Sequence, residues 1–278
     1  MIVEKTHKIL KENNIKAKKI FGQNFLTDKK VLEDIINASS LSSDDYVIEI
    51  GPGLGSLTEM LCKGAKKVLC YEIDRDLAAM LPERLKEFNN FEIIGDDYLR
   101  RNVSKDIDDY FGTDVNVKVI ANIPYNITSP IMLSLLKERR VNTIVLMVQK
   151  ELAERFSSQP SSKEYGSISA YLSYMGDNDI VRIVKRNCFE PVPNVDSAVY
   201  RFIRRNDDSD EAFLIFLRKA FEQKRKKLIN NLSKDFPKDN LISILNEMNL
   251  DENIRAEAMS ADQLYKMYQK VVGDKDEN

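Results

Sequence analysis

The sequence predicts an α/β fold in which a mostly parallel sheet is covered by helices on both faces, followed by a small all-helical domain. Two observations predict this class. Between residues 45 and 149, short apolar runs alternate with segments of helical periodicity, which is typical of repeated strand–helix units. After residue 206 the strand signal ends, and residues 211–272 carry apolar side chains at three- and four-residue spacing. We therefore expect one domain over residues 1–206 and a helical domain over residues 207–278.

The elements follow in chain order from the same two patterns. Short apolar runs bounded by polar or turn residues predict strands at Tyr46–Ile50, Lys67–Tyr71, Phe91–Ile94, Val117–Ala121 and Thr143–Val148. Amphipathic stretches between them predict helices at Ser56–Cys62, Asp76–Phe88 and Pro130–Arg139. Residues 150–205 are typical of two helices followed by strands at Ile180–Val184 and Ser197–Ile203, which extend the same sheet.

Composition excludes several classes of function. The 278 residues are 43% hydrophobic, enough for a main domain with a smaller appendage. The single histidine, His7, lies in a lysine-rich leader, which argues against a Ser-His-Asp triad. The three cysteines, Cys62, Cys70 and Cys188, form no CxxC pair, so no metal site is expected. The longest apolar stretch, Ile144–Val148, is too short for a membrane span, and no signal peptide is evident. We expect a cytoplasmic protein without a membrane partner.

Charge is segregated along the chain although the net charge is only -2. Residues 4–19 carry six lysines against two glutamates, and residues 218–227 carry six cations against one glutamate. A third basic group spans residues 182–205. Single runs of this kind are often solvated helix faces, but three together favour an anionic polymer as partner.

A glycine-rich loop follows the first strand of the predicted sheet. Gly51, Gly53 and Gly55 stand between this strand and a helix, where a backbone without Cβ atoms approaches a nucleotide cofactor closely. The next strand ends in Glu72, 21 residues after Gly51, where a carboxylate can accept both ribose hydroxyl groups. This arrangement is shared by enzymes that use NAD(P) and by those that use S-adenosylmethionine (SAM). A tight structural turn is the simpler alternative.

Two details favour SAM. Glu49 stands two residues before the first glycine, and the third glycine comes too early for the GxGxxG spacing, so that Ser56 occupies the last position. After the third strand, Asp97 is positioned to bind the adenine amino group of the cofactor, and the adjacent Asp96 is an open alternative. We therefore expect a Rossmann-like, SAM-dependent methyltransferase sheet.

The segment Asn122–Tyr125, with the sequence Asn-Ile-Pro-Tyr, ends the fourth strand at the edge where open α/β sheets bind ligands. An exocyclic amine is a poor nucleophile, and two acceptors, the Asn122 side-chain oxygen and a backbone carbonyl, can take its two hydrogens. The lone pair then points at the sulfonium methyl, and alignment supplies most of the catalysis. Tyr125 can stack on the base, and Phe189 can cover its second face, which requires an extruded or unpaired nucleotide. We predict catalytic roles for these three residues.

These residues are similar to those of the small-subunit (16S-type) ribosomal RNA adenine dimethyltransferases, the KsgA family. The likeness covers about residues 18–272. It is carried by the following motifs: Lys19–Leu26, Glu49–Gly55, Glu72, Asp97, Asn122–Tyr125, Met147–Glu151, Tyr165–Gly166, Phe189–Ala198, Arg218–Phe221 and Arg225–Leu232.

The resemblance implies SAM-dependent dimethylation of two adjacent adenosines near the 3′ end of small-subunit rRNA. It implies that Asn24, Leu26, Gly51, Glu72, Asp97 and Asn122 line the cofactor site, with Gly53 in the same loop. It also implies that the basic helix contacts RNA through Arg218, Lys224, Arg225, Lys226 and Lys227. The expected partner is small-subunit rRNA within a partly assembled small ribosomal subunit, bound by a monomer. The alternatives are a resistance-type methyltransferase of large-subunit rRNA and a mainly non-catalytic ribosome assembly factor.

Overall fold

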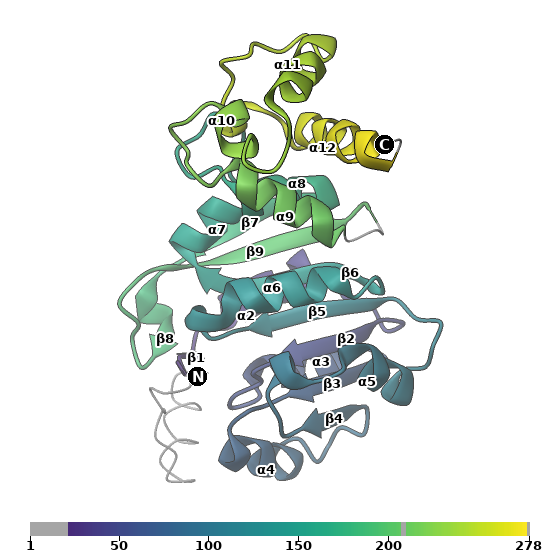
Figure 1. The fold of residues 1–278 in the computed structure, drawn as a ribbon. Helices are drawn as coiled ribbons and strands as arrows, with labels where there is room; N and C mark the ends of the chain where they lie inside the picture. Colours follow the sequence, from purple (N-terminus) through teal and green to yellow (C-terminus); the bar gives the residue numbers. More distant parts are fainter. Residues whose placement is uncertain (1–21, 207–209, 277–278) are drawn as a thin grey trace. The chain divides into compact units, whose positions relative to one another are not determined.

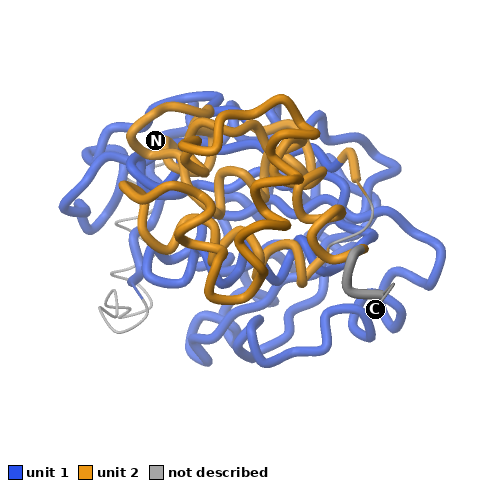
Figure 2. Tube along the Cα trace, turned by 45° about the horizontal axis from the view of Figure 1, so that its top comes forward, with its two compact units in different colours: residues 1–153, 179–204 blue, residues 154–178, 205–278 orange. Residues whose placement is uncertain are grey.

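The computed structural model describes residues 22–206 and 210–276 (Figure 1). The features predicted within residues 1–21, namely His7, the lysine-rich leader and the start of the Lys19–Leu26 motif, lie outside the described residues. The chain divides into two compact units, residues 1–153 with 179–204 and residues 154–178 with 205–278 (Figure 2). The second unit includes residues 154–178, which the predicted division at residue 206 assigns to the first domain.

A seven-stranded sheet has the order β4-β3-β2-β5-β6-β9-β7. Its strands are β2 (Tyr46–Ile50), β3 (Lys67–Tyr71), β4 (Phe91–Ile94), β5 (Val117–Asn122), β6 (Val141–Gln149), β7 (Gly176–Val184) and β9 (Ser197–Arg204). The strands from β4 to β6 pair in parallel, whereas β9 pairs antiparallel with β6. The predicted α/β class and the extension of the sheet by the last two strands are confirmed.

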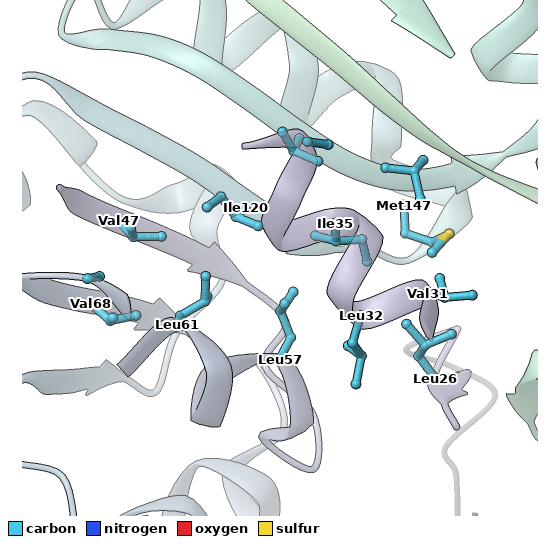
Figure 3. Packing of buried hydrophobic residues seen from close by; sticks show 14 of the residues in the cluster. Leu26, Val31, Leu32, Ile35, Val47, Leu57, Leu61, Val68, Ile120 and Met147 are labelled. Carbon is cyan, nitrogen blue, oxygen red and sulfur yellow. The ribbon is translucent and has the colours of Figure 1, made fainter. Parts of the chain in front are cut away.

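The sheet is covered on both faces, and the alternation of side chains along the strands shows how. Cys70, Ile120 and Met147 belong to one core cluster with residues of α2 (Lys29–Ala38) and α3 (Ser56–Gly64) (Figure 3). Tyr71, next to Cys70, points to the opposite face, where its hydroxyl donates to Asp106 of α5 (Val103–Tyr110) at 3.2 Å. Because side chains alternate along a strand, the central strands bury side chains against the helical layers on both faces of the sheet.

The remaining elements of the first unit connect these layers. They are β1 (Phe25–Leu26), α4 (Arg75–Arg84), η2 (Tyr98–Arg100), η3 (Tyr125–Ile127), α6 (Thr128–Lys137), η4 (Arg186–Cys188) and β8 (Phe189–Glu190), and α7 (Lys150–Phe156) begins at the end of β6. The sequence analysis did not predict β1, β8, α2 or α5. Helix α2 begins where the Asp28 carboxylate accepts hydrogen bonds from the backbone of Lys30 and Val31, and it buries Val31, Leu32 and Ile35 at helical spacing.

The second unit is helical, as predicted for the C-terminal region. Its helices are α8 (Ser167–Met175), α9 (Glu211–Ala220), α10 (Leu228–Leu232), α11 (Lys238–Glu247) and α12 (Ala261–Asp276), with the short turn η5 (Ala256–Ala258). An aromatic cluster joins three of them: the ring of Tyr265 stacks on Tyr174 at 4.3 Å and meets Phe213 edge-on at 5.0 Å. Such pairs contribute roughly 1 kcal/mol each beyond the area that they bury.

Candidate active site

A cavity opens at the carboxyl ends of β2, β3, β4 and β5. It has about 1020 Å³ of empty volume, including its open mouth. Its lining comes mainly from residues 22–26, 49–54, 71–73, 96–98 and 122–125. Open α/β sheets bind their ligands at this edge, and a volume of this order suits a nucleotide-sized molecule. The cavity contains all the residues predicted to bind the cofactor.

The glycine loop has the backbone that only glycine adopts without strain. Gly51, Gly53 and Gly55 have φ values of 73°, 57° and 77°. A Cβ atom on Gly53 would lie 3.2 Å from the ring of Phe25, and one on Gly55 would lie 2.6 Å from a methyl group of Leu81. The loop therefore fits between the 22–26 segment and α4 because it has no side chains there, and its backbone forms one wall of the cavity.

Glu72 is held in a defined orientation beside this loop. Its two carboxylate oxygens accept hydrogen bonds from the backbone N–H of Gly53 at 3.0 Å and of Asp74 at 2.9 Å. Burial raises the pKa of Glu72, and these two hydrogen bonds act in the opposite direction. Each carboxylate oxygen keeps a second lone pair, so the group is prepared to accept hydrogen bonds from a diol.

Glu49 lies deeper in the same cavity, where its side chain is only 1% exposed. The thiol of Cys70 donates a weak hydrogen bond to it over 3.6 Å. Burial is the main reason that the pKa of Glu49 rises from 4.5 to about 8. The carboxyl group therefore keeps its proton in the folded protein at neutral pH.

Asp96 and Asp97 both line the cavity, so the choice between them stays open. One oxygen of Asp97 accepts from the backbone N–H of Leu99 at 3.0 Å, and one oxygen of Asp96 accepts from the N–H of Asp97 at 2.8 Å. Arg101 lies 3.7 Å from Asp96 and is itself anchored at 2.6 Å by the buried Asp106. Internal contacts thus hold both carboxylates at the rim.

Asn122 ends β5 with its side-chain amide in a defined orientation. Its Nδ2 donates a hydrogen bond to the backbone carbonyl of Asn24, 3.2 Å away. The side-chain oxygen is then the part of the amide that remains to accept a hydrogen bond from a ligand. Tyr125 lies in the next turn and also lines the cavity, and its hydroxyl oxygen lies 2.6 Å from that of Ser197.

Phe189 is placed differently from the other predicted catalytic residues. Its side chain is 2% exposed and belongs to the core cluster that contains α2, and it is not among the residues that line the cavity. Its strand β8 pairs antiparallel with β1, with Phe189 opposite Leu26 and Glu190 opposite Phe25. The carbonyl of Cys188 also accepts from the backbone of Thr27 at 2.8 Å. The role of Phe189 in stacking stays a prediction.

The predicted RNA-binding residues lie in the second unit. Arg218 is exposed in the last turn of α9, and residues 224–227 are exposed in the segment between α9 and α10. Lys224 also donates to the backbone carbonyl of Lys163 at 3.0 Å, which orders its side chain. The other three cations of the segment are exposed to solvent.

Several residues that line the cavity or hold its lining are not predicted from the sequence. Ile73, directly after Glu72, is 45% exposed and forms an apolar wall, and its position after the acidic residue is the signal that could have identified it. Gln23 donates to Asp74 at 2.8 Å and so ties the N-terminal segment to the loop after β3. Ser197 lies within the Phe189–Ala198 motif, but its pairing with Tyr125, 72 residues away, has no local signal in the sequence.

The described residues contain neither a candidate metal site nor a candidate membrane-spanning helix. Within them, no group of three or more His, Cys, Asp or Glu side chains is arranged to hold a metal ion. No helix in the described ranges has both the length and the apolar composition that a bilayer crossing requires.

Comparison with known sequences adds an independent line of evidence. The family model for ribosomal RNA adenine dimethylase matches residues 14–272. A protein of Leuconostoc mesenteroides named ribosomal RNA small subunit methyltransferase A is 38% identical, over 95% of this chain and 93% of its own length. Proteins with the same name from Bacillus mycoides and Latilactobacillus sakei are each 40% identical, over 93% and 94% of this chain and 92% and 91% of their own lengths.

Solved structures are similar as well. A dimethyladenosine transferase from Plasmodium falciparum superimposes with a TM-score of 0.78 at 26% identity, covering 90% of this chain and 98% of its own. The 23S rRNA methyltransferase ErmE gives a TM-score of 0.69 at 26% identity, covering 90% of this chain and 100% of its own. Both likenesses extend well beyond the sheet into the rest of the chain.

Proposed function

Since the chain belongs to the ribosomal RNA adenine dimethylase family, we propose that it dimethylates the 6-amino groups of two adjacent adenosines near the 3′ end of small-subunit rRNA, with SAM as methyl donor. The curated relatives are named as small-subunit rRNA methyltransferases, and this chain covers more than nine tenths of their lengths. The proposal depends on the orientation of Asn122. Its Nδ2 is bound to the carbonyl of Asn24, so its side-chain oxygen can accept a hydrogen bond from the target amine in the cavity beside the glycine loop.

The residues of the cavity fit SAM. Gly51 and Gly53 bring the loop backbone to the cavity wall, and the fixed carboxylate of Glu72 suits the two ribose hydroxyl groups. Ile73 offers an apolar surface for the adenine ring, and Asp97 an acceptor for its amino group. Asn24 and Leu26 close the remaining side. When bound, SAM supplies an activated methyl group on a sulfonium centre, so no metal ion or histidine base is needed.

Asn122 performs the step that the target amine cannot perform alone. Its side-chain oxygen accepts a hydrogen bond from one N–H of the amine, and a backbone carbonyl of the same loop accepts one from the other N–H. The amine nitrogen then becomes more tetrahedral, and its lone pair is directed at the methyl carbon. Because Nδ2 is engaged by Asn24, the amide cannot turn and present a donor instead. Alignment of the two reactants accounts for most of the rate.

Tyr125 supplies the surface on which the target base rests, because its ring lines the cavity three residues after Asn122. Phe189 is proposed to cover the second face of the base. Its ring is buried in the core in the present structure, so this role requires β8 to shift when the base enters. A base held between two rings must leave its stack, which suits an unpaired or flipped nucleotide.

The exposed cations at residues 218 and 224–227 are proposed to contact the rRNA backbone. We further propose that the substrate is rRNA within a partly assembled small subunit, that the protein acts as a monomer in the cytoplasm, and that catalysis uses no metal. The likeness to ErmE keeps methylation of large-subunit rRNA as the second candidate, and a binding role in subunit assembly as the third.

The experiment that separates these candidates uses methyl-labelled SAM with unmethylated small or large ribosomal subunits, followed by nucleoside mass spectrometry. Dimethyladenosine in the small subunit alone is the expected result. Label in the large subunit would replace the proposal with the second candidate. Tight binding of the small subunit without any label would establish a role in assembly and contradict methyl transfer.

A further inference from the structure

Two hydroxyl groups meet behind the loop that carries Asn122. The phenol oxygen of Tyr125 and the side-chain oxygen of Ser197 lie 2.6 Å apart, which is a short hydrogen bond between neutral groups. Tyr125 comes from η3 after β5, and Ser197 is the first residue of β9. The sequence motifs around the two residues are separate, and the fold brings them together.

Ser197 is a rigid partner. Its side chain is fully buried, and its backbone pairs with Gln149 in the antiparallel β6–β9 ladder. The preceding residue, Asp196, accepts hydrogen bonds from the backbone N–H of Arg186 at 3.1 Å and, through its carbonyl, from that of Lys150 at 3.0 Å. The chain at this point is therefore fixed from both sides, and the hydroxyl of Ser197 has little freedom to move.

Tyr125 is held less firmly by its own element. It begins a three-residue turn with no side-chain cap, and the hydroxyl of Thr128 contacts its carbonyl at 3.3 Å. Tyr125 lines the cavity and is half-buried, so packing does not enclose it completely. Burial raises the pKa of Tyr125, which keeps the phenol protonated and able to donate. The tip of the ring is thus fixed chiefly through Ser197.

We infer that Ser197 is a positioning residue for methyl transfer: its hydroxyl holds the ring of Tyr125 in the plane that the target adenine needs. The hydroxyl of Ser197 does not touch the substrate and acts through Tyr125 alone. This inference rests on the proposed role of Tyr125 as the stacking surface. A base that rests on a misoriented ring presents its amine away from Asn122, and a small displacement of reacting groups lowers turnover strongly.

The test begins with Ser197→Ala, assayed with small ribosomal subunits at saturating SAM. We expect kcat to fall roughly 3- to 10-fold, the value of one hydrogen bond, with the Kd for SAM and the thermal stability nearly unchanged. Ser197→Thr and Ser197→Val form a matched pair, because the two side chains have nearly the same shape and only threonine keeps the hydroxyl. The threonine variant should turn over roughly 3- to 10-fold faster than the valine variant. Equal rates for this pair would overturn the inference.

A double-mutant cycle with Tyr125→Phe isolates the bond itself. If Ser197 acts through the phenol, Ser197→Ala should have no further effect on kcat once the phenol is gone. Losses that multiply in the double variant would show that Ser197 acts elsewhere, which would also overturn the inference. Tyr125→Ala separates a failure of the proposed role of Tyr125 from a failure of the inferred role of Ser197. Full activity of that variant would contradict the proposed role of Tyr125, whereas an inactive Tyr125→Ala beside a fully active Ser197→Ala would contradict only the role of Ser197.

Discussion

The side-chain amide of Asn122 donates to the backbone carbonyl of Asn24 across 3.2 Å, and this bond joins the reacting loop to the N-terminal segment that lines the same cavity. The bond determines which end of the amide meets a ligand. An amide group has a donor end and an acceptor end of nearly equal shape, so without a partner either end could face the target amine. Asn24 therefore orients Asn122 through its backbone carbonyl, and a substitution of the Asn24 side chain leaves that carbonyl in place.

We expect Asn122→Ala to lower methyl transfer by at least about 100-fold, the usual loss when a group that stabilises the transition state is removed. Binding of the small subunit should change little, because the amide acts on the reacting amine. Asn126→Ala is the matched control, since Asn126 lies on the same loop and is exposed. Single-turnover kinetics with labelled SAM give the comparison. Near-normal turnover of the Asn122 variant would contradict the mechanism.

Gly55→Ala should destabilise the protein by roughly 2–4 kcal/mol, the sum of left-handed backbone strain and overpacking. Its φ is 77°, and the new Cβ would lie 2.6 Å from Leu81, which is fully buried and cannot move aside freely. Gly112→Ala is the control, because Gly112 has a φ of 104° with no atom within 4 Å of the added Cβ. That variant should lose only the strain, about 1–2 kcal/mol. Urea unfolding measures both, and equal losses would show that Leu81 yields without cost.

Glu49 makes the stability of the ligand-free protein depend on pH. Its pKa rises from 4.5 in the unfolded chain to about 8 in the folded protein, so the folded state holds a proton that the unfolded state has released. The stabilisation is complete below about pH 4.5 and is lost as the pH rises through about 8.

Replacing this carboxyl group by an amide removes the titration. Between about pH 6 and about pH 8, the native sequence should lose on the order of 2 kcal/mol more unfolding free energy than Glu49→Gln. Urea unfolding of both proteins at both pH values, without SAM, measures how much the unfolding free energy of each changes with pH. Parallel pH dependences in the two proteins would mean that Glu49 is ionised in the folded state.

Replacing Lys224, Arg225, Lys226 and Lys227 together by Gln should weaken binding of small-subunit rRNA and flatten its salt dependence. Each lost phosphate contact lowers the slope of log K against log salt by roughly 0.7–0.9. The control is an equal change of charge at Lys29, Lys30, Lys86 and Lys105, which are exposed on the other compact unit. Filter binding at several salt concentrations compares the two. An unchanged slope in the first variant would show that its cations face only solvent.

The sequence was most informative where a residue's role depends on its neighbours in the chain. The glycines of residues 51–55 stand between a strand and a helix, so their backbone conformation and their place at the sheet edge follow from local pattern. The boundaries of β2, β3 and β4 agree with the prediction for the same reason. The strands β2 and β3 are buried and largely apolar, and the edge strand β4 is a short apolar run between turn residues, so neither signal needs knowledge of a partner strand.

Features that depend on distant partners could not be predicted in this way. Strands β1 and β8 have two residues each, too few for any periodicity, and they exist because residues 25–26 meet residues 189–190. Phe189 of β8 is buried in the core cluster that contains α2, whereas the sequence alone predicted that it stacks on the target base. The bond between Tyr125 and Ser197 joins two segments that the sequence does not connect.

The β1–β8 pairing has a consequence for the order of events on the protein. Its first strand continues from Asn24 on the cofactor side, and its second strand carries Phe189 on the side assigned to the base. A movement that frees Phe189 must therefore either break the short ladder or displace the segment next to the cofactor. Under the proposed roles, the binding of SAM and the binding of the target base are coupled through this pairing. By thermodynamic reciprocity, the factor by which SAM changes the affinity for RNA then equals the factor by which RNA changes the affinity for SAM.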